Sequence, residues 1–284
     1  MRISAALILA VLCVGGAAAE PAKTLFGGKP GPAASLAPAP FGSHARGCLA
    51  GAAKLPETGP SWQAMRLERN RNWGHPDLVA FVERLGAAAQ QLGWEGIFVG
   101  DLSQPRGGPM TSGHSSHQIG LDADIWLRPG MARELSFRER SEISSFIVTT
   151  PDHRSVNERW TTEHMALIQA AAEDGAVARI FVHAAIKERM CRHAGENRAW
   201  LGKVRPWWGH NAHFHVRLAC PAGAAACEDQ APPPPGDGCD ETLAWWFSDE
   251  ALNPKPGPAP KPKPKPPLTL ADLPAECATV LEAE

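Results

Sequence analysis

Two stretches of the chain alternate apolar and polar residues as half-buried β-strands do. In residues 121–127 the apolar members are Leu121, Ala123, Ile125 and Leu127. In residues 213–218 they are Phe214, Val216 and Leu218. A period of two turns the intervening residues toward the opposite face. We therefore expect two strands that hold Asp122, Asp124, His213 and His215 on a polar surface.

Other segments have helical or short strand patterns. Apolar residues recur at helical spacing after Pro76, which can open a helix at its first turn. The predicted helices cover 76–92, 134–147, 162–173 and roughly 184–202. Short apolar runs predict strands at 97–99 and 179–183, and Pro and Gly residues predict a long loop at 103–116. Together these elements predict an α+β domain with a small antiparallel sheet, surrounded by helices.

The polar surface of the two strands has the chemistry of a metal site. Residues 114–126 and 210–217 contain five of the eleven histidines, too many to read each one as a separate structural residue. Neutral imidazole and carboxylate suit zinc, with bonds of about 2.0–2.2 Å and an open position when the metal is catalytic. His117 and Asp124 can meet at one ion if the chain bends at Gly120, with His215 as third ligand. One zinc is expected.

The remaining polar residues suggest a hydrolytic mechanism. His213 shares a face with His215 and is the predicted general acid–base. His210 is a second catalytic residue, expected to stabilise an oxyanion. Asp122 is not expected to bind the metal itself. It is expected to orient the imidazole of a histidine ligand.

Several motifs give the chain a resemblance to a known family. They are Gly-His-Pro-Asp-Leu at 74–78, Gly-His-Ser-Ser-His-Gln at 113–118, Lys-Val-Arg-Pro-Trp at 203–207 and Cys-Glu-Asp-Gln at 227–230. With His117-x6-Asp124 and His213-x-His215 they resemble the penicillin-insensitive murein endopeptidases. These belong to the zinc peptidase group that also includes lysostaphin-type endopeptidases, D-alanyl-D-alanine peptidases and the hedgehog domain. The resemblance runs from about Cys48 to Cys239, and Cys277 also fits.

The resemblance implies a periplasmic zinc D,D-endopeptidase that is insensitive to penicillin. Its substrate would be the D-alanyl–meso-diaminopimelyl cross-link between peptidoglycan stem peptides. One alternative is a D,D- or L,D-carboxypeptidase on the same scaffold. Another is a non-catalytic zinc domain that binds the cell wall, although such a domain needs no His213 beside an open metal position.

The resemblance also suggests a possible site for a second metal ion. The family carries an Asp and a His before a tryptophan like Trp160, and these have been linked to an additional ion. The corresponding set here would be His114, Asp152 and His153. Asp152 and His153 are adjacent rather than spaced, so a solvated loop is the alternative.

Cysteine usage points to an oxidising compartment. Apart from Cys13, the chain has six cysteines, which suggests three disulfides. Spacing alone favours only Cys220–Cys227 among the many pairings that six cysteines allow. The family resemblance implies Cys48–Cys277 and Cys191–Cys239, which would pin both termini to the domain.

Composition divides the chain into five parts. Residues 1–19 have the layout of a cleavable signal peptide, too short for a stable membrane span. An extended N-terminal arm follows at 20–47, then a peptidase domain at 48–250. A linker rich in Pro and Lys covers 251–269, and 270–284 form a terminal segment tied back by its cysteine.

Charge excludes one class of partner. The net charge is −2, so nothing favours a nucleic-acid partner bound through phosphate neutralisation. Peptidoglycan stem peptides are the expected partner. The sequence leaves open whether the chain forms a homodimer.

Overall fold

The computed structural model describes residues 19–254 and 266–284. In these residues the α-helices are α1 (Ala22–Gly27), α2 (Pro76–Gln91), α3 (Phe137–Glu142), α4 (Thr162–Glu173), α5 (Ala184–His193), α6 (Glu241–Ala244), α7 (Asp249–Leu252) and α8 (Glu276–Glu282). The strands are β1 (Ala39–Ser43), β2 (Arg46–Ala50), β3 (Ala53–Lys54), β4 (Trp62–Ala64), β5 (Trp73–Gly74), β6 (Ile97–Val99), β7 (Asp122–Pro129), β8 (Val177–Val182), β9 (Val204–Pro206), β10 (His213–Leu218) and β11 (Cys227–Glu228). Short 3₁₀ helices lie at Leu67–Arg69, Ala199–Lys203, Trp245–Phe247 and Leu270–Asp272. This is the predicted α+β fold.

Two predicted segments fall largely outside this description. The signal peptide predicted at 1–19 lies outside the described residues except for its last position. Residues 255–265 of the predicted linker also lie outside them. Within the residues that are described, no helix combines the length and apolar character that a membrane crossing requires.

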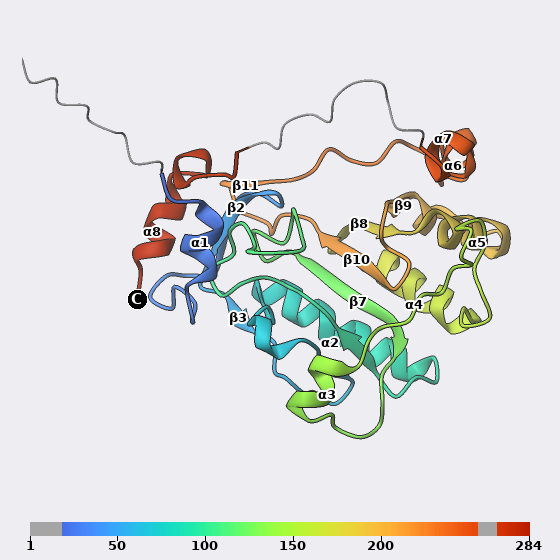
Figure 1. The fold of residues 1–284 in the computed structure, drawn as a ribbon, viewed down its shortest axis with the longest axis horizontal. Helices are drawn as coiled ribbons and strands as arrows, with labels where there is room; N and C mark the ends of the chain where they lie inside the picture. Colours follow the sequence, from blue (N-terminus) through green and yellow to red (C-terminus); the bar gives the residue numbers. More distant parts are fainter. Residues whose placement is uncertain (1–18, 255–265) are drawn as a thin grey trace, which may run out of the picture.

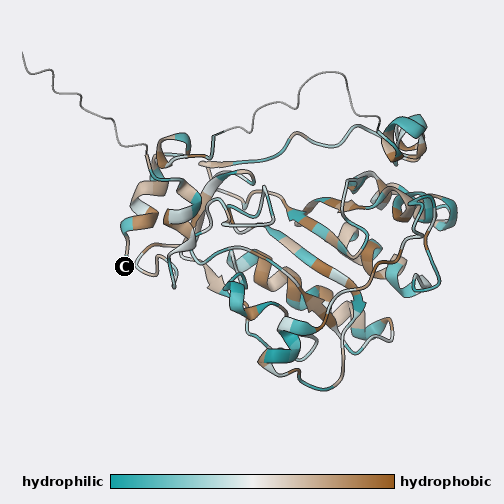
Figure 2. Ribbon diagram, in the orientation of Figure 1, coloured by the Kyte–Doolittle hydropathy of each residue, from teal (hydrophilic) through white to brown (hydrophobic). Residues whose placement is uncertain are grey.

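A six-stranded sheet forms the centre of the fold, in the order β4-β6-β7-β10-β8-β9 (Figure 1). The inner strands β6, β7, β10 and β8 pair antiparallel, as predicted, whereas the outer strands β4 and β9 pair in parallel with β6 and β8. Helices α2 and α4 pack against each other and against strands of this sheet. Figure 2 shows hydrophobic residues along α2 and the neighbouring β7. The opposite face of the sheet is therefore left for polar side chains.

Helix α2 begins and packs as its sequence predicts. Pro76 occupies the first turn, and the Asp77 backbone N–H donates to His75 Nδ1 at 3.2 Å, which caps the helix. Its buried residues are Leu78, Phe81, Val82, Leu85, Gly86 and Ala89. They join one core with Ala123, Ile125, Phe214 and Val216 of the two central strands. Burying an aliphatic side chain of this size contributes about 1.5–3 kcal/mol, so this layer holds the two site strands in place.

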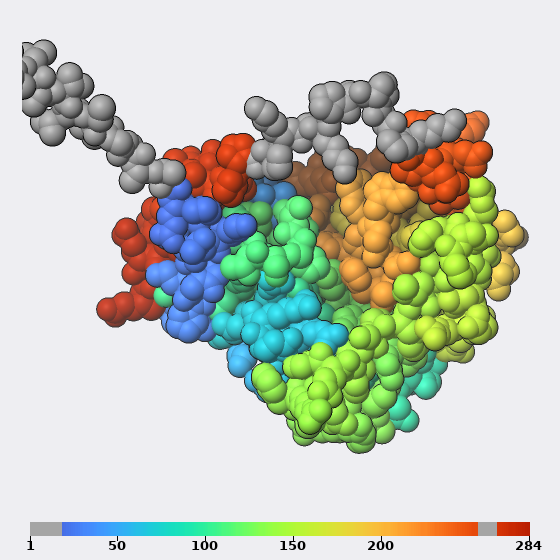
Figure 3. Space-filling view, in the orientation of Figure 1, coloured from blue at the N-terminus to red at the C-terminus, as the bar shows by residue number. Residues whose placement is uncertain are grey.

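The N-terminal arm is more structured than predicted. Residues 20–47 contain helix α1 and strand β1, and β1 joins a second sheet in the order β11-β1-β2. Phe26 of α1 is fully buried in a small core with Val280 and Leu281 of α8. Helices α1 and α8 accordingly lie together at one end of the molecule (Figure 3). A local pattern could not reveal this, because the apolar partners lie at the other end of the sequence.

One helix prediction was too long. The helix predicted at 134–147 is only Phe137–Glu142, opened by a capping box between Ser136 and Glu139. Beyond it the chain is extended, and the Val148 backbone N–H donates to Asn211 O at 3.0 Å. Here pairing with a distant segment outweighs local helix propensity. The helices predicted over roughly 184–202 are α5 and a 3₁₀ helix at Ala199–Lys203.

Three disulfides join the same cysteines that the sequence analysis named. They are Cys48–Cys277, Cys191–Cys239 and Cys220–Cys227. The first connects β2 with α8 across 229 residues, whereas the third closes a separation of only 7.

We expect the long disulfide to stabilise the fold more than the short one. In the chain-entropy model a cross-link stabilises more as its loop lengthens. The double variant Cys48→Ala/Cys277→Ala should lower the free energy of unfolding by about 2–5 kcal/mol, measured by urea denaturation. The matched control, Cys220→Ala/Cys227→Ala, should lose less. An equal or larger loss in the control would contradict this account.

Candidate metal centre

Strands β7 and β10 bring the predicted polar residues onto one face. Their register places His215 opposite Asp124, and Arg217 opposite Asp122. Directly opposite residues of a strand pair share a face of the sheet. These side chains therefore lie on the face that α2 and α4 leave free.

The loop before β7 carries His117 to the same place. His117 has a left-handed backbone, with φ of 66°, and Gly120 follows with φ of 69°. A Cβ at Gly120 would collide with Leu49, so glycine is needed at the predicted bend. The backbone N–H of His117 donates to Asp122 Oδ2 at 2.9 Å, and its Nδ1 lies 2.5 Å from the Leu102 carbonyl oxygen.

These contacts fix the tautomer of His117. A carbonyl oxygen can only accept, so His117 Nδ1 carries the proton and Nε2 presents a lone pair. Nε2 lies 3.5 Å from Asp124 Oδ1. Both atoms are buried, and neither has a hydrogen-bond partner in the described residues. Two acceptors facing each other away from water call for a cation between them.

His215 faces the same carboxylate. Its Nδ1 lies 3.2 Å from Asp124 Oδ1, and its Nε2 lies 3.1 Å from Asp122 Oδ1. Each ring nitrogen thus faces a carboxylate and either can carry the proton, so a cation bound at Nδ1 would leave the proton on Nε2, toward Asp122. Burial acts to lower the pKa of His215, but Asp122 and Asp124 outweigh it and raise the pKa overall. The two carboxylates therefore draw positive charge to this point.

Asp122 lies behind the centre and touches four groups. Besides the His117 backbone N–H and the His215 ring, it accepts from Arg217 Nε at 2.8 Å and lies 3.1 Å from His44 Nδ1. Burial acts to raise the pKa of Asp122, yet His44 and Arg217 hold it well below its usual range. Burial also acts to raise the pKa of Asp124, and His213 and His117 hold that pKa well below its usual range. Both carboxylates are thus ionised at neutral pH.

His114 lies beside these residues rather than with Asp152 and His153. Its Nε2 donates to Asp101 Oδ2 at 3.0 Å and lies 3.4 Å from Asp124 Oδ2. Among the described residues, His114, His117 and Asp124 form a group whose ligand atoms lie within 4.8 Å of one another. This compact group is compatible with a metal ion. The bond to Asp101 makes His114 Nε2 a donor, however, so its lone pair is less available than that of His117.

The predicted second metal set is not gathered. Asp152 is exposed and accepts from Thr150 Oγ1 at 2.6 Å and from the Arg154 backbone N–H at 3.1 Å. The ring of His153 lies 5.3 Å from that of His183. Over residues 19–254 and 266–284, these two residues and His114 form no group with ligand atoms within 4.8 Å. Here Asp152 organises a turn.

His213 and His210 line the open side. His213 Nε2 lies 3.6 Å from Asp124 Oδ1, with its side chain 25 % exposed. His210 Nδ1 donates to Trp208 O at 2.7 Å, and the two imidazole rings lie 5.0 Å apart. Burial lowers the pKa of both residues, that of His210 to about 4 with a contribution from His213. Both rings are therefore neutral near pH 7, as proton acceptors must be.

Two residues near the centre were not among the predicted site residues. His44 comes from the turn between β1 and β2 and is buried at 3 % exposure. Asp101 follows β6 and is held by Arg71 Nη1 at 2.8 Å. An acidic residue just after a buried strand is a signal for Asp101, whereas His44 lies in a segment without periodicity.

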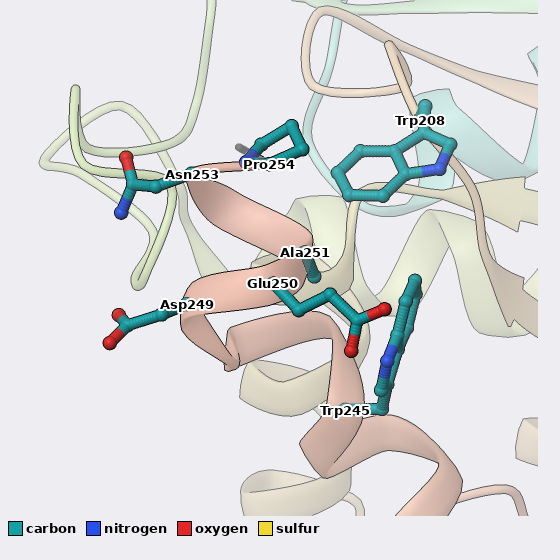
Figure 4. A pocket seen from close by; sticks show the side chains of 7 residues that line it. All are labelled: Trp208, Trp245, Asp249, Glu250, Ala251, Asn253 and Pro254. Atoms are coloured by element: carbon teal, nitrogen blue, oxygen red, sulfur yellow. The ribbon is translucent and has the colours of Figure 1, made fainter. Parts of the chain in front are cut away.

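One hollow adjoins the centre, and a second lies beside Trp208. The first, of about 500 Å³, is called the arginine pocket here. Its lining includes His114, His210, His215, Arg179, Arg205, Arg217, Phe181, Trp207 and Trp246. The second, of about 1040 Å³, is lined by Trp208, Trp245, Asp249, Glu250, Ala251, Asn253 and Pro254 (Figure 4). Trp207 and Trp208 are 54 % and 49 % exposed, so they form surface near the site instead of core.

Comparison with known proteins agrees with the geometry. The sequence profile of the family described as penicillin-insensitive murein endopeptidase matches residues 40–282. A protein of that name from Haemophilus influenzae is 49 % identical over 211 residues, covering 73 % of each chain. Another from Klebsiella pneumoniae is 43 % identical over 242 residues, covering 85 % of each chain. A third, from Salmonella heidelberg, is 42 % identical over 265 residues, covering 93 % of this chain and 92 % of its own. The chain belongs to the penicillin-insensitive murein endopeptidase family of peptidases.

Proposed function

We propose that this protein is a periplasmic zinc D,D-endopeptidase that cleaves D-alanyl–meso-diaminopimelyl cross-links of peptidoglycan. The names of its relatives support action on murein. The main support for a bound metal is that the buried Nε2 lone pair of His117 faces Asp124 Oδ1. Neither atom has a hydrogen-bond partner in the described residues. The three disulfides support an oxidising compartment such as the periplasm.

His117, Asp124 and His215 would hold the ion. Their donor set of two imidazoles and a carboxylate is one that zinc takes in catalytic sites. A bound zinc supplies a water that is acidic near neutral pH and polarises the scissile carbonyl. Asp122 is a positioning residue, because it orients the His215 ring and the backbone of His117.

The protein's own residues would move the protons. Neutral His213 accepts a proton from the attacking water and returns it to the leaving amine. His210 lies beside it, with its Nδ1 fixed by the Trp208 carbonyl oxygen. In the neutral ring the proton on Nδ1 is the only one, so His210 would stabilise the negative charge on the carbonyl oxygen only after its Nε2 takes up a proton.

Two alternatives differ in their products. A D,D- or L,D-carboxypeptidase on this scaffold would release terminal D-alanine and leave cross-links intact. A non-catalytic wall-binding domain would release nothing. The arrangement of His213 beside Asp124, at 3.6 Å, favours a peptidase over a binder.

We expect about one zinc per chain. The described residues bring His114, His117 and Asp124 together, with His215 Nδ1 3.2 Å from Asp124 Oδ1, whereas Asp152 lies in a turn. Elemental analysis of the purified protein measures this ratio. His153→Ala should keep the same zinc content. Two zincs in the wild type, with one lost in His153→Ala, would require a second site.

His215→Ala and His213→Ala should separate metal binding from proton transfer. The first removes a ligand, so zinc and activity should be lost together. The second leaves the ligands in place, so zinc should remain while turnover falls by about 10²–10⁴-fold. The measurements are zinc content of folded protein and cleavage of purified cross-linked muropeptide dimers, with products identified by mass.

The outcomes distinguish the alternatives. Monomeric muropeptides from the dimer support the endopeptidase, and release of D-alanine alone supports a carboxypeptidase. Wild-type activity in both zinc-containing variants would reject the peptidase reading of this site. Loss of zinc in His213→Ala but not in His215→Ala would mean that the two roles are reversed.

Asp122→Asn should weaken zinc binding without removing a ligand. The amide keeps the shape but loses the charge that faces His215 and Arg217, and loss of such an outer partner typically costs about 10–100-fold in metal affinity. Competition with a chelator of known affinity measures the change. Asp249→Asn, at a side chain that is 94 % exposed, is the matched control and should bind zinc as the wild type does. Equal affinity of both variants would show that Asp122 does not position the ligands.

A further inference from the structure

The polar face of the sheet continues past the metal centre to three arginines. Register places His215 of β10 opposite Phe181 of β8, and Phe181 opposite Arg205 of β9. The next row places Arg217 opposite Arg179. Because directly opposite residues share a face and strands lie about 4.8 Å apart, Arg205 stands roughly 10 Å along the sheet from His215. The arginine pocket is thus continuous with the proposed zinc ligands.

Two of the three guanidinium groups lie against one aromatic ring. The Cζ atoms of Arg217 and Arg179 lie 5.2 and 5.9 Å from the centre of the Phe181 ring. Trp207 and Trp246 also line the pocket. The pocket therefore combines apolar walls with several cationic donors, which suits a ligand that is part hydrocarbon and part anion.

Only one of these arginines has a carboxylate partner. Arg217 is paired with Asp122 at 2.8 Å and also donates to Gln230 Oε1 at 2.7 Å. In the described part of the chain, neither Arg179 nor Arg205 has a carboxylate oxygen within 4.0 Å, although Arg179 donates to Ala231 O at 2.6 Å. Arg205 Nη1 is buried against Gly238 and has no hydrogen-bond partner there. A buried guanidinium donor left unpaired is costly.

Neighbouring cations repel one another around Arg205. Burial lowers the pKa of Arg179, with contributions from Arg217 and Arg205. Burial, followed by Arg205, also lowers the pKa of Lys187 to about 7, so Lys187 is charged only in part near neutral pH. Asp237 and Asp240 act in the opposite direction on Lys187, but in the described residues neither makes an ion pair with Arg205 or Arg179 within 4.0 Å. The three arginines of the pocket therefore outnumber their one carboxylate partner, Asp122.

We propose that Arg205 and Arg179 bind a free carboxylate of the cross-linked stem peptide and so fix the register of the substrate against the zinc ligands. This proposal rests on the proposed endopeptidase function. Guanidinium groups pair with carboxylates through parallel charge-assisted hydrogen bonds, and the aromatic walls would contact the aliphatic diaminopimelyl chain. Such a contact would favour a cross-linked substrate with a free carboxylate over a neutral peptide.

Two carboxylates of the substrate have this chemistry. One is on the diaminopimelyl residue, next to the nitrogen of the scissile bond. The other is the main-chain carboxylate at the end of the stem peptide. Three synthetic dimers distinguish them: one with both groups as free acids, and two in which one or the other is a primary amide.

The wild-type protein should cleave one of the amides with kcat/KM lower by about tenfold to a hundredfold, as loss of a charged hydrogen bond predicts. That amide identifies the bound carboxylate. Arg205→Gln should lower kcat/KM for the free acid and bring the acid-to-amide ratio near unity. Arg189→Gln, at an exposed residue outside the pocket, is the matched control and should keep the wild-type ratio. Zinc content and circular dichroism confirm that each variant is folded.

Equal kcat/KM of the wild type for all three dimers would overturn the proposal, as would an unchanged ratio in both Arg205→Gln and Arg179→Gln. Failure of the proposed function looks different, because none of the dimers would be cleaved. In that case calorimetry with the free diaminopimelyl peptide and its amide still tests the pocket. Tighter binding of the acid, lost in Arg205→Gln, supports it, and equal binding of acid and amide rejects it.

Discussion

The burial of one ionised carboxylate, Asp122, constrains the rest of the structure. An isolated charge in a dry interior is prohibitively unstable, so every donor around Asp122 must be held in place. The four groups around it come from three segments: the His117 backbone N–H from the loop before β7, His215 and Arg217 from β10, and His44 from the turn after β1. Satisfying this single group therefore aligns the loop before β7, strand β10 and the turn after β1. The positions of His117 and His215 in the candidate metal centre therefore follow from the need to surround Asp122 with compensating groups.

This constraint gives the N-terminal segment a reason to be folded. His44 reaches Asp122 only because β1 and β2 form a hairpin, and that hairpin is anchored by Cys48–Cys277 and by the small core of α1 and α8. The terminal disulfide is thus connected to the centre through a short series of contacts. Damage to the tail would act on the site through the position of His44, with no ligand altered.

The sequence analysis succeeded where the chemistry is local. Alternation along 121–127 and 213–218 correctly assigns which side chains leave the core, since the apolar members are buried against α2 and α4. It could not find partners that meet across long separations, such as Arg71 with Asp101 or His44 with Asp122. It also overextended the helix at 134–147, because the pairing of Val148 with Asn211 is invisible to a local pattern. The roles of individual site residues remain predictions from sequence supported by this geometry.

The sheet would allow the proposed hydrolysis and the proposed substrate binding to share one surface. Alternation sends every second residue of β7, β10, β8 and β9 to the same face, so a line of polar positions crosses the strands at a spacing of about 4.8 Å. Asp124 and His215 begin that line and Arg205 ends it, with Phe181 between them. Because α2 and α4 hold the opposite face rigid, the distance between the carboxylate end and the cationic end is fixed by strand pairing. A substrate bound at the arginines, as proposed, would lie at a distance from Asp124 and His215, the proposed zinc ligands, that is set by strand pairing and not by a loop movement.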